Sequence, residues 1–426
     1  MTVLIAGGGI GGLALALSLH QIGVKCRVFE SVKEIKPLGV GINVLPHACR
    51  ELIELGLQDE LERTSVRTSE LAYFSKHGNK IWSEPRGLEA GYKWPQYSIH
   101  RGELQFILLH TAIQRLGKEN VITGHHVSHW DETPDGVRAY FTGKDGTTIG
   151  SEDGSLLIAC DGIHSAIRTR LLPDEGPPLW SRRILWRGVT LAKPFMSASS
   201  MIMAGYPQVK FVAYPISRPD ERGQQMINWI AEREFAEDYE WRREDYNRAA
   251  KLEEFAPWFE EWNFGWLDVP GLIRDAEYCF EYPLVDRDPL ERWTHGRVTL
   301  LGDAAHPMYP IGSNGSSQAI LDARVLAREI QAKGETTAAL DAYEAERRPA
   351  TSQLVLLNRG NGPERVMQMV EERAPNGFNV VTDVLSREEL EEVANNYKRV
   401  AGFQVEALNA KPAIVQPRAT VAAQAS

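Results

Sequence analysis

Three glycines near the start of the chain have the spacing of a dinucleotide-binding turn. Gly7, Gly9 and Gly12 fit G-x-G-x-x-G, between an apolar segment at residues 2–6 and an apolar helix that begins at Ile10. In such a turn the first glycine makes the bend, the second lets the backbone approach a pyrophosphate, and the third lets the helix pack on the strand. The free N–H groups at the helix start would hold the pyrophosphate.

An acidic residue follows this turn at the position that binds ribose in dinucleotide-binding folds. The second predicted strand, residues 25–30, ends at Glu30. A carboxylate there favours a free ribose hydroxyl over a 2′-phosphate. Glycine turns also occur for purely structural reasons, but here the strand, helix, second strand and acid are in register. The pattern therefore predicts a dinucleotide site and leaves NAD and FAD both open.

Two further segments place an acid beside a glycine after an apolar run. These are Asp161-Gly162 and Gly302-Asp303. Asp161 is placed either to hold a nucleotide hydroxyl or simply to cap the helix that follows, a role that Ser165 shares.

The second of these segments leads into a Pro/Gly loop from Pro310 to Gly315 and then into a helix expected to reach Glu329. The loop would present backbone N–H groups at the helix start, which suits an anion or a polarised ring edge. Two such sites in one chain suit a long cofactor with a charged middle and a reactive ring at its far end.

The elements around these motifs alternate between helices and short strands. Residues 31–46 are predicted to form a loop with special backbone angles close to a bound group, or only a turn before the next helix. The pattern further predicts a helix at 47–55, paired strands at 70–83, an amphipathic helix at 101–116 and hairpins at 119–150. Arg101 stands at the start of the amphipathic helix, where it is either a surface residue or the partner of an anion.

The second half of the chain changes in character. Short β-like runs and most of the tryptophans fall within 173–289, which suggests a mixed sheet that walls an apolar pocket. A polar, aromatic-rich helical stretch is expected at 241–266. Helices are expected at 340–372 and 387–401, with disorder from Lys411 onward.

The bulk composition limits the classes of function. A chain of 426 residues suggests two or three domains, and the net charge of −10 argues against a nucleic-acid partner. The four cysteines are scattered without a C-x-x-C pair, so neither a metal site nor a disulfide framework is indicated. A strand predicted from Thr2 leaves no space for a leader, and no apolar run is long enough for a membrane span. We therefore expect a cytoplasmic protein.

Together the motifs resemble a known family. The Gly7–Gly12 turn with Glu30, the Cys160–Gly162 segment and Leu301–Pro307 occur in the order and spacing of the single-component FAD-dependent aromatic hydroxylases. These are the class A flavoprotein monooxygenases of the p-hydroxybenzoate and salicylate hydroxylase group. The resemblance covers residues 1 to about 360.

Further stretches are most similar to the phenazine-carboxylate hydroxylase branch that acts in pyocyanin synthesis. They include 39–43, 82–87, 97–105, 186–189 and 308–315. This similarity indicates a subfamily and does not fix the substrate.

The resemblance implies an α/β fold in which a Rossmann-like FAD-binding domain is interleaved with a mixed β-sheet substrate domain, followed by C-terminal helices. The expected segments are FAD-binding residues 1–70, 96–175 and 290–360, substrate-domain residues 71–95 and 176–289, and C-terminal residues 361–426.

The resemblance also implies which residues hold FAD. The turn would hold the pyrophosphate, Glu30 the adenosine ribose, Val127 the adenine through its backbone, and Arg101 the pyrophosphate or ribityl region. Asp161 belongs to a segment that the family links to both FAD and NAD(P)H. The full set of expected FAD-binding residues is Gly7, Gly9, Ile10, Gly11, Gly12, Glu30, Arg101, Val127, Asp161, Gly302, Asp303, Pro310, Gly312, Asn314 and Gly315.

The implied reaction uses NADH or NADPH and O2 to hydroxylate an aromatic or N-heteroaromatic substrate through a flavin C4a-hydroperoxide. A carboxylate substrate and a coupled decarboxylation are both compatible with the family. The cofactor carries this chemistry, so no metal and no protein nucleophile is expected. Candidate catalytic residues are Tyr214 and Tyr309, which could face the pocket, and Arg187, which could meet a substrate carboxylate. His306 belongs to the Gly302-Asp303 motif and is expected to be structural.

Other functions on the same sequence remain open. One is an FAD-dependent oxidase or dehydrogenase, which would not need the oxygen-transfer pocket. Another is a flavin-loaded binding or redox-sensing module without turnover. The sequence leaves NADH against NADPH undecided, and it is compatible with a monomer or a homodimer.

Overall fold

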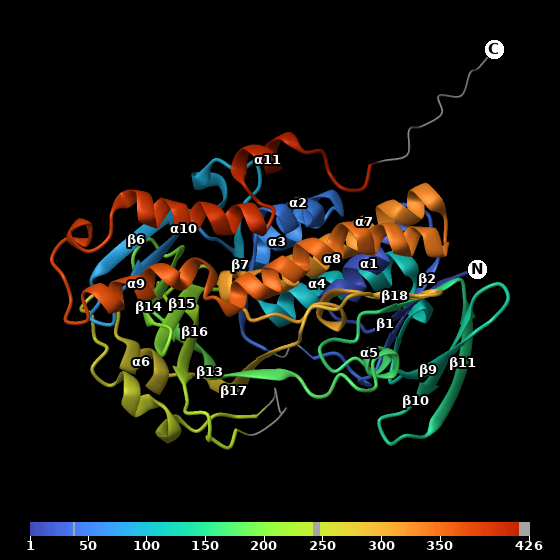
Figure 1. The fold of residues 1–426 in the computed structure, drawn as a ribbon, viewed down its shortest axis with the longest axis horizontal. Helices are drawn as coiled ribbons and strands as arrows, with labels where there is room; N and C mark the ends of the chain where they lie inside the picture. Colours follow the sequence, from blue (N-terminus) through green and yellow to red (C-terminus); the bar gives the residue numbers. More distant parts are fainter. Residues whose placement is uncertain (37–38, 242–247, 417–426) are drawn as a thin grey trace, which may run out of the picture.

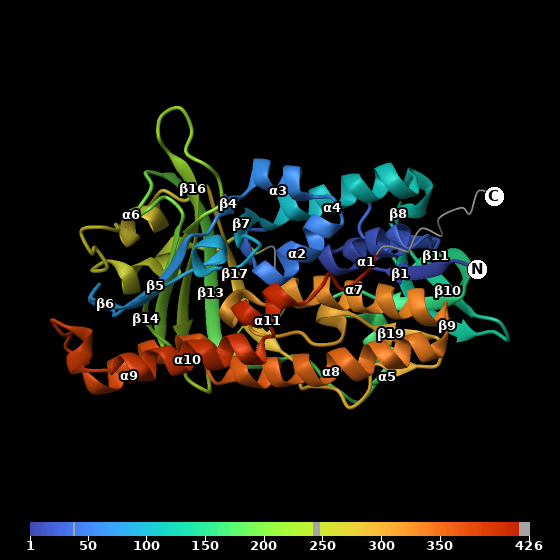
Figure 2. The same ribbon diagram turned by 90° about the horizontal axis from the view of Figure 1, so that it is seen from above.

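The computed structural model describes residues 1–36, 39–241 and 248–416. A sheet built around the N-terminal strand lies at one end of the molecule and a larger mixed sheet at the other (Figure 1). Seen from above, helices of the C-terminal part run along one side of both sheets (Figure 2). The predicted α/β architecture with C-terminal helices is confirmed.

The first sheet has the parallel core of a nucleotide-binding fold. Its order is β18-β19-β12-β1-β2-β8, and every pair is parallel except β18 with β19. All four residues of β1 are buried, because helices cover the sheet. The strands are β1 (Val3–Ala6), β2 (Cys26–Glu30), β8 (Val121–Thr123), β12 (Leu156–Ala159), β18 (Thr294–His295) and β19 (Val298–Leu300).

The helix that follows the glycine turn, α1 (Ile10–Gln21), is buried on nearly all sides. It packs between α4 (Arg101–Leu116) and α7 (Gly315–Lys333). This explains why it is apolar all round rather than amphipathic. The shorter helices of this half are α2 (Pro46–Glu54), α3 (Gln58–Thr64) and α5 (Ala166–Leu171). The helices predicted at 47–55 and 101–116 are therefore confirmed.

The second sheet joins strands from two distant parts of the sequence. Its order is β17-β13-β16-β15-β14-β5-β6, with β14 and β5 parallel and the other neighbours antiparallel. The strands are β5 (Glu70–Phe74), β6 (Lys80–Pro85), β13 (Leu179–Ala192), β14 (Ser200–Tyr206), β15 (Val209–Pro215), β16 (Gln225–Glu234) and β17 (Tyr278–Asp286). The paired strands predicted at 70–83 are confirmed. The predicted domain boundaries themselves stay predictions.

Two small sheets complete the strands. The predicted hairpins correspond to β9 (His126–Glu132), β10 (Val137–Thr142) and β11 (Thr148–Gly154), which pair as a meander. The other sheet has the order β3-β7-β4, with β3 (Gly41–Val44), β4 (Val66–Arg67) and β7 (Tyr97–His100). The loop predicted at 31–46, of which residues 37–38 lie outside the described part, is thus partly a strand, because residues 41–44 pair with β7.

The C-terminal helix predicted at 340–372 is interrupted. It consists of α8 (Thr337–Arg359) and α9 (Arg365–Arg373), separated by a short 3₁₀ turn at Gly362–Glu364. Asn361 and Gly362 have φ angles of +67° and +47°, which no continuous helix accommodates. Beyond α9 follow α10 (Arg387–Val400) and α11 (Val405–Ala410), so the helix predicted at 387–401 is confirmed.

Two other expectations need correction. The stretch 241–266 was predicted to be helical, but its described residues, 241 and 248–266, contain no α-helix; their helical turns are the 3₁₀ turns at Leu252–Glu254 and Ala256–Phe259. Its aromatic rings instead fill the core between these turns and the mixed sheet, where β13 and α6 (Val269–Arg274) also pack. The tail predicted to be disordered from Lys411 is ordered through residue 416, and Val415 lies in the main core. Residues 242–247 and 417–426 lie outside the described part.

Within the described residues, no cluster of three or more metal-ligating side chains occurs. The same part of the chain contains no helix whose length and apolar character suit a bilayer crossing. All four cysteines are free, and three of them are buried.

Candidate functional site

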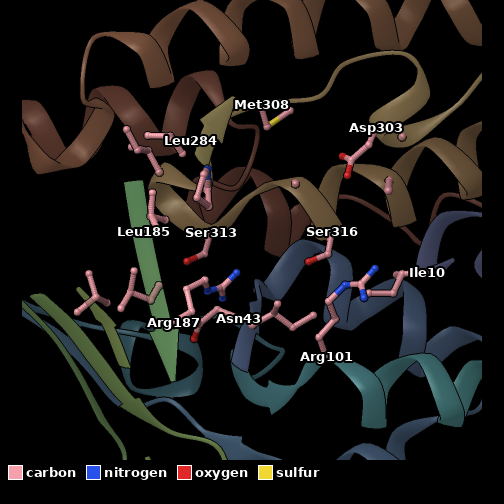
Figure 3. Close-up of a pocket in the computed structure, with 18 of the residues that line it drawn as sticks. Ile10, Asn43, Arg101, Leu185, Arg187, Leu284, Asp303, Met308, Ser313 and Ser316 are labelled. Carbon is pink, nitrogen blue, oxygen red and sulfur yellow. The ribbon is translucent and has the colours of Figure 1, made fainter. Parts of the chain in front are cut away.

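A cavity of about 340 Å³ lies between the glycine turn and the mixed sheet. At the nucleotide end it is lined by backbone and side chains of Gly9, Ile10 and Gly11, with Arg101 and Asp303 nearby (Figure 3). The opposite wall, here called the cavity floor, is one face of the sheet. The floor residues are Leu185, Arg187, Met201, Met203, Lys210, Val212, Tyr214, Ile230 and Glu232.

The three motif glycines occupy three different steric situations. Gly7 has a φ of +107°, and an added Cβ would lie 2.3 Å from the carbonyl oxygen of Cys160. On Gly12, a Cβ would lie 2.1 Å from the carbonyl oxygen of Gly7, so the start of α1 packs directly on the turn. Gly9 has nothing within 4 Å of an added Cβ and lines the cavity. The bend, the packing contact and the open backbone are the features that a bound pyrophosphate requires.

Glu30 stabilises the backbone of the glycine turn through a hydrogen bond to its carboxylate. Its Oε2 accepts a hydrogen bond from the Gly8 N–H (2.8 Å), and its Oε1 accepts one from the Val32 N–H (2.9 Å). On the other side Gln105, a residue that was not predicted, donates from Nε2 to the Gly8 carbonyl (2.8 Å). Gln105 lies one helical turn after Arg101 on α4, a spacing that could have identified it. The predicted ribose contact of Glu30 stays a prediction.

Asp161 caps α5. Its Oδ2 accepts from the Ala166 N–H (2.9 Å), and Ser165 accepts from the Arg168 N–H (2.9 Å), so the helix-cap interpretation is confirmed for both residues. The Oδ1 of Asp161 is buried with no hydrogen-bond partner among the described residues. Burial raises the pKa of this carboxyl group. Gly162, the next residue, has a φ of +80° and lines the cavity.

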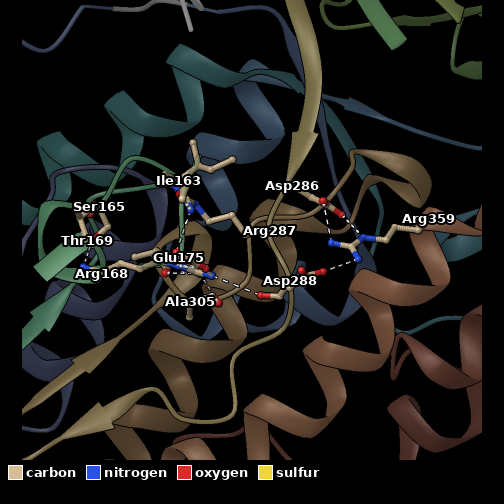
Figure 4. A network of polar contacts seen from close by, with 12 residues as sticks. Ile163, Ser165, Arg168, Thr169, Glu175, Asp286, Arg287, Asp288, Ala305 and Arg359 are labelled. Carbon is tan, nitrogen blue, oxygen red and sulfur yellow. Dashed lines mark hydrogen bonds and ion pairs between the residues drawn. The ribbon is translucent and has the colours of Figure 1, made fainter. Parts of the chain in front are cut away.

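An ion-pair network joins α5 to the loop after β19 (Figure 4). Arg168 is only 1% exposed and donates from Nη1 to the carbonyl oxygens of Ala304 and Ala305 (2.9 and 3.0 Å). Its Nε donates to Glu175 (2.9 Å), and the same carboxylate accepts from Arg287 (2.9 Å). The two acid–glycine segments are therefore fixed relative to each other.

The Gly302-Asp303 segment is anchored on a buried acid. Asp322 accepts from the Gly302 N–H (3.1 Å) and from Nε2 of His306 (2.5 Å), while Arg347 donates to its other oxygen (2.7 Å). Burial alone would raise the pKa of Asp322, but His306 and Arg347 hold it below its usual value. His306 thus has the structural role expected of it.

Asp303 and Arg101 point into the cavity (Figure 3). Asp303 is exposed toward the cavity, although protein surrounds it on its other sides. This burial raises the pKa of its carboxyl group, and the nearby His306 and Arg101 oppose the rise. Arg101 is exposed at the start of α4. A cation beside an open glycine turn fits the charged middle of a dinucleotide.

The loop from Pro310 to Gly315 is supported by α10. Gly312 has a φ of +68°, and an added Cβ would lie 1.9 Å from the hydroxyl oxygen of Tyr397. Asn314 is fully buried, and its Nδ2 donates to the same hydroxyl oxygen (2.9 Å). Pro310 and Gly315 line the cavity, whereas Gly312 and Asn314 lie behind that surface and shape the loop.

Val127 lies away from the cavity lining. It is buried in β9 opposite Phe141, and the neighbouring His125 donates its backbone N–H to the Glu30 carbonyl (2.8 Å). This places its strand beside the end of β2. Its predicted contact with adenine stays a prediction.

Tyr214 and Arg187 converge on one backbone group. The Tyr214 hydroxyl and the Arg187 Nη2 each donate to the carbonyl oxygen of Gly41 at 2.7 Å. Tyr214 is 2% exposed, and burial raises its pKa to about 12, against the influence of Arg187. Tyr214 is therefore a protonated donor at neutral pH rather than a base. The Arg187 guanidinium also lies over the ring of Tyr282, 5.7 Å from its centroid.

Tyr309 lies just outside the cavity lining. Although its neighbours Met308 and Pro310 line the cavity, Tyr309 does not. Its ring packs in a small core with Leu284 and Ile311. Leu284 and Ile311 line the cavity themselves, so Tyr309 packs directly behind its wall, and its part in catalysis stays a prediction.

Sequence reasoning missed three charged residues at the far end of the cavity. Lys210, Glu232 and Glu364, here called the ionic cluster, all line it and all are buried. The alternation of β15 could have indicated that Lys210 shares a face with Tyr214. Glu364 carried no signal, because it comes from the unpredicted break between α8 and α9.

Fold and site define a class: a flavin-binding domain of the p-hydroxybenzoate hydroxylase type, with its cavity closed by a mixed sheet. The model of the FAD binding domain family matches residues 1–254 and 284–357. The chain belongs to this family, and FAD is its cofactor.

Known proteins narrow the class. A phenazine 1,6-dicarboxylic acid hydroxylase of Lysobacter antibioticus is 46% identical over 363 residues, which cover 84% of this chain and 89% of that protein. A 3-amino-4-hydroxybenzoate 2-monooxygenase of Streptomyces platensis is 32% identical over 375 residues, 85% of this chain and 88% of that one. The solved structure of Klebsiella pneumoniae HpxO with FAD and uric acid has a TM-score of 0.71 at 25% identity and covers 97% of both chains. The protein is an FAD-dependent aromatic monooxygenase, as the motifs predicted.

Proposed function

We propose that the protein hydroxylates a phenazine carboxylate, with NADH or NADPH as electron donor and O2 as oxygen donor. Bound FAD supplies the electron transfer and the oxygen chemistry. The observation that carries the proposal is a single cavity that runs from the glycine turn to a sheet face with an apolar centre and a cation. The 46% identity to a phenazine dicarboxylic acid hydroxylase supports the choice of ring system.

The centre of the floor suits a flat aromatic ring. Met201, Met203, Val212 and Ile230 present apolar side chains there, and all come from adjacent strands. Methionine thioethers make favourable contacts with aromatic rings and adapt to their shape. An apolar floor also keeps water away from the reacting ring, which limits wasteful release of reduced oxygen.

Arg187 is the residue proposed to bind a substrate carboxylate. Its Nη2 already donates to Gly41, which fixes the direction of the guanidinium. The Nε is buried without a partner among the described residues. A guanidinium held in this way has N–H donors left for a carboxylate, the geometry in which arginine binds most strongly. Tyr214 supports the same backbone carbonyl and keeps Gly41 in place.

The test is substrate-stimulated oxidation of NADH and NADPH by the purified holoenzyme. The compounds compared are phenazine-1-carboxylate, phenazine-1,6-dicarboxylate, 3-hydroxybenzoate and urate. We expect a phenazine carboxylate to stimulate oxidation and to gain one oxygen atom, as seen by mass spectrometry with ¹⁸O2. Flavin reduction by the substrate without NAD(P)H would instead support an oxidase or dehydrogenase. If the protein binds FAD tightly but shows neither activity, a flavin-loaded binding or redox-sensing module without turnover is supported instead.

The proposed setting is the cytoplasm, where NAD(P)H is available and free cysteines stay reduced. The proposed assembly state is a monomer or a homodimer.

A further inference from the structure

The ionic cluster lies at the Lys210 end of β15, whereas the Arg187 guanidinium meets the Tyr214 end through the Gly41 carbonyl. Lys210 on β15 pairs with Glu232 on β16 at 2.9 Å and with Glu364 at 2.5 Å. Each side chain is at most 5% exposed. Glu364 reaches the cluster from the 3₁₀ turn at the break between α8 and α9, so the cluster joins the sheet to the C-terminal helices.

The floor therefore has a charged group at each end and an apolar centre. Along β15, Lys210, Val212 and Tyr214 share the cavity face, while Phe211 and Ala213 belong to the core on the opposite face. Four residues of β15 separate Lys210 from Tyr214 by about 13 Å, and the Tyr214 hydroxyl shares the Gly41 carbonyl with the Arg187 guanidinium. That span suits a planar substrate of two or three fused rings with a polar substituent at each end.

Stability alone does not account for the cluster. Three buried charges are costly to desolvate, and apolar residues of similar volume often serve stability equally well. An ammonium group has three N–H donors, and the two carboxylates use two of them. Buried charges that line a ligand cavity are therefore candidates for ligand recognition.

We propose that Lys210, Glu232 and Glu364 form a second carboxyl-binding subsite, so that the substrate is an aromatic dicarboxylate held between this cluster and Arg187. This inference rests on the proposed function, because it takes the floor as the binding surface for the ring. The cluster would then distinguish a dicarboxylate from a monocarboxylate, which Arg187 alone cannot do.

Charge balance requires a proton to enter with the second carboxylate. Lys210 and the nearby Arg183 balance Glu232 and Glu364, so one more negative charge must be neutralised. Burial raises the pKa of Glu364; Lys210 lowers it and Glu232 raises it further. Glu364 is thus placed to take up one proton from solvent and share it with the substrate carboxyl. The titratable groups that act on Glu364 or are influenced by it are Arg183 (β13), Lys210 (β15), Glu232 (β16), Tyr73 (β5) and Tyr397 (α10).

The first test compares dissociation constants of phenazine-1-carboxylate and phenazine-1,6-dicarboxylate for the FAD-loaded protein, measured by the change in flavin absorbance. The wild type should prefer the dicarboxylate by about tenfold or more. Lys210→Met should abolish that preference, because it removes the ammonium donor of the subsite. The double variant with Glu364→Gln removes one positive and one negative charge and leaves Glu232 paired with Arg183 (3.6 Å), so loss of the preference there cannot be assigned to an unbalanced cluster. Glu234→Gln, on the same strand but outside the cavity lining, should retain the preference.

The second test measures proton uptake by calorimetry in buffers of different ionisation enthalpy. The wild type should take up close to one proton with the dicarboxylate, and its affinity should fall by up to about tenfold per pH unit as Glu364 ionises. Glu364→Gln should bind without uptake and without this pH dependence. Equal affinity for both acids, or equal uptake by wild type and Glu364→Gln, would overturn the subsite. These readouts do not need turnover, so a lack of hydroxylation would count against the proposed function alone.

Discussion

At the residue scale, the polar side chains that the motifs single out divide into two groups. The first group, Glu30, Asp161 and His306, forms hydrogen bonds with other groups of the protein. These bonds stabilise a turn, the start of a helix and a loop. Asp303 and Arg101 instead point into the cavity. The first group shapes the backbone that meets the cofactor, and the second is placed to contact it.

Tyr214 illustrates how burial decides a role. Its pKa of about 12 keeps the hydroxyl protonated through the neutral range, so it donates to Gly41 and does not accept a proton. Tyr214→Phe should lower kcat/KM by less than about tenfold, because Arg187 still holds the Gly41 carbonyl. The pH profile of kcat/KM between about pH 6 and pH 9 should keep its shape. Tyr309→Phe, outside the cavity lining, is the control. If Tyr214→Phe loses one limb of the pH profile and Tyr309→Phe does not, Tyr214 acts as a base.

At the element scale, loops that face the cavity are shaped by elements behind them. The loop from Pro310 to Gly315 depends on α10, through the Tyr397 hydroxyl. The glycine turn depends on the close approach of α1 to β1. The break between α8 and α9 delivers Glu364 to the cavity. The site is therefore sensitive to changes that touch no ligand.

The glycine turn predicts two separable defects. In Gly12→Ala the new Cβ would collide with the carbonyl oxygen of Gly7, 2.1 Å away, so we expect a loss of stability of about 1–3 kcal/mol. Gly9→Ala has open space, so this variant should fold normally but bind FAD at least about tenfold more weakly. Thermal unfolding of the apoprotein and titration with FAD measure the two effects. Equal FAD affinity in Gly9→Ala and wild type would contradict the assigned pyrophosphate site.

The Tyr397 hydroxyl predicts a defect in coupling. Tyr397→Phe leaves the buried Nδ2 of Asn314 without this acceptor, at a cost of about 1–3 kcal/mol, and loosens the loop that lines the cavity. We expect less hydroxylated product, and more hydrogen peroxide, for each NAD(P)H consumed. Tyr92→Phe is a matched control, since it also loses a buried hydroxyl to the C-terminal part, at Phe403, without touching the loop. Equal coupling in both variants would remove this role from α10.

At the scale of the whole molecule, the C-terminal part closes on the N-terminal half. Arg50 of α2 donates to the Lys411 carbonyl (3.3 Å), and the Ile414 N–H donates to Glu51 (3.3 Å). Val415 joins the core built around β1 and α1. Both ends of the described chain therefore stabilise the same nucleotide-binding sheet.

This packing predicts that the C-terminal segment contributes to global stability. Val415→Asp places a charge in the main core and should destabilise the protein by at least about 2 kcal/mol, measured by urea unfolding of the holoenzyme. Lys411→Asp introduces the same residue at an exposed position of the same segment and should change stability little. Similar unfolding midpoints for the two variants would mean that the segment does not stabilise the fold.

The sequence by itself determined the cofactor end of the site. A glycine turn, an acid after the second strand and two acid–glycine segments are local patterns, because each role depends on backbone geometry within a few residues. The steric situations of Gly7, Gly9 and Gly12 agree with the roles assigned from spacing alone. The α/β class and the enzyme family followed from the same motifs.

Only the tertiary structure decided the substrate end. Lys210, Glu232 and Glu364 are far apart in sequence and meet through strand register and an unpredicted helix break. Tyr309 lies between two cavity residues in sequence yet is outside the lining, and it packs behind that lining against Leu284 and Ile311. Such placements depend on long-range packing rather than on local residue type. The residues expected to hold the cofactor could therefore be predicted from the sequence, whereas the ionic cluster could not.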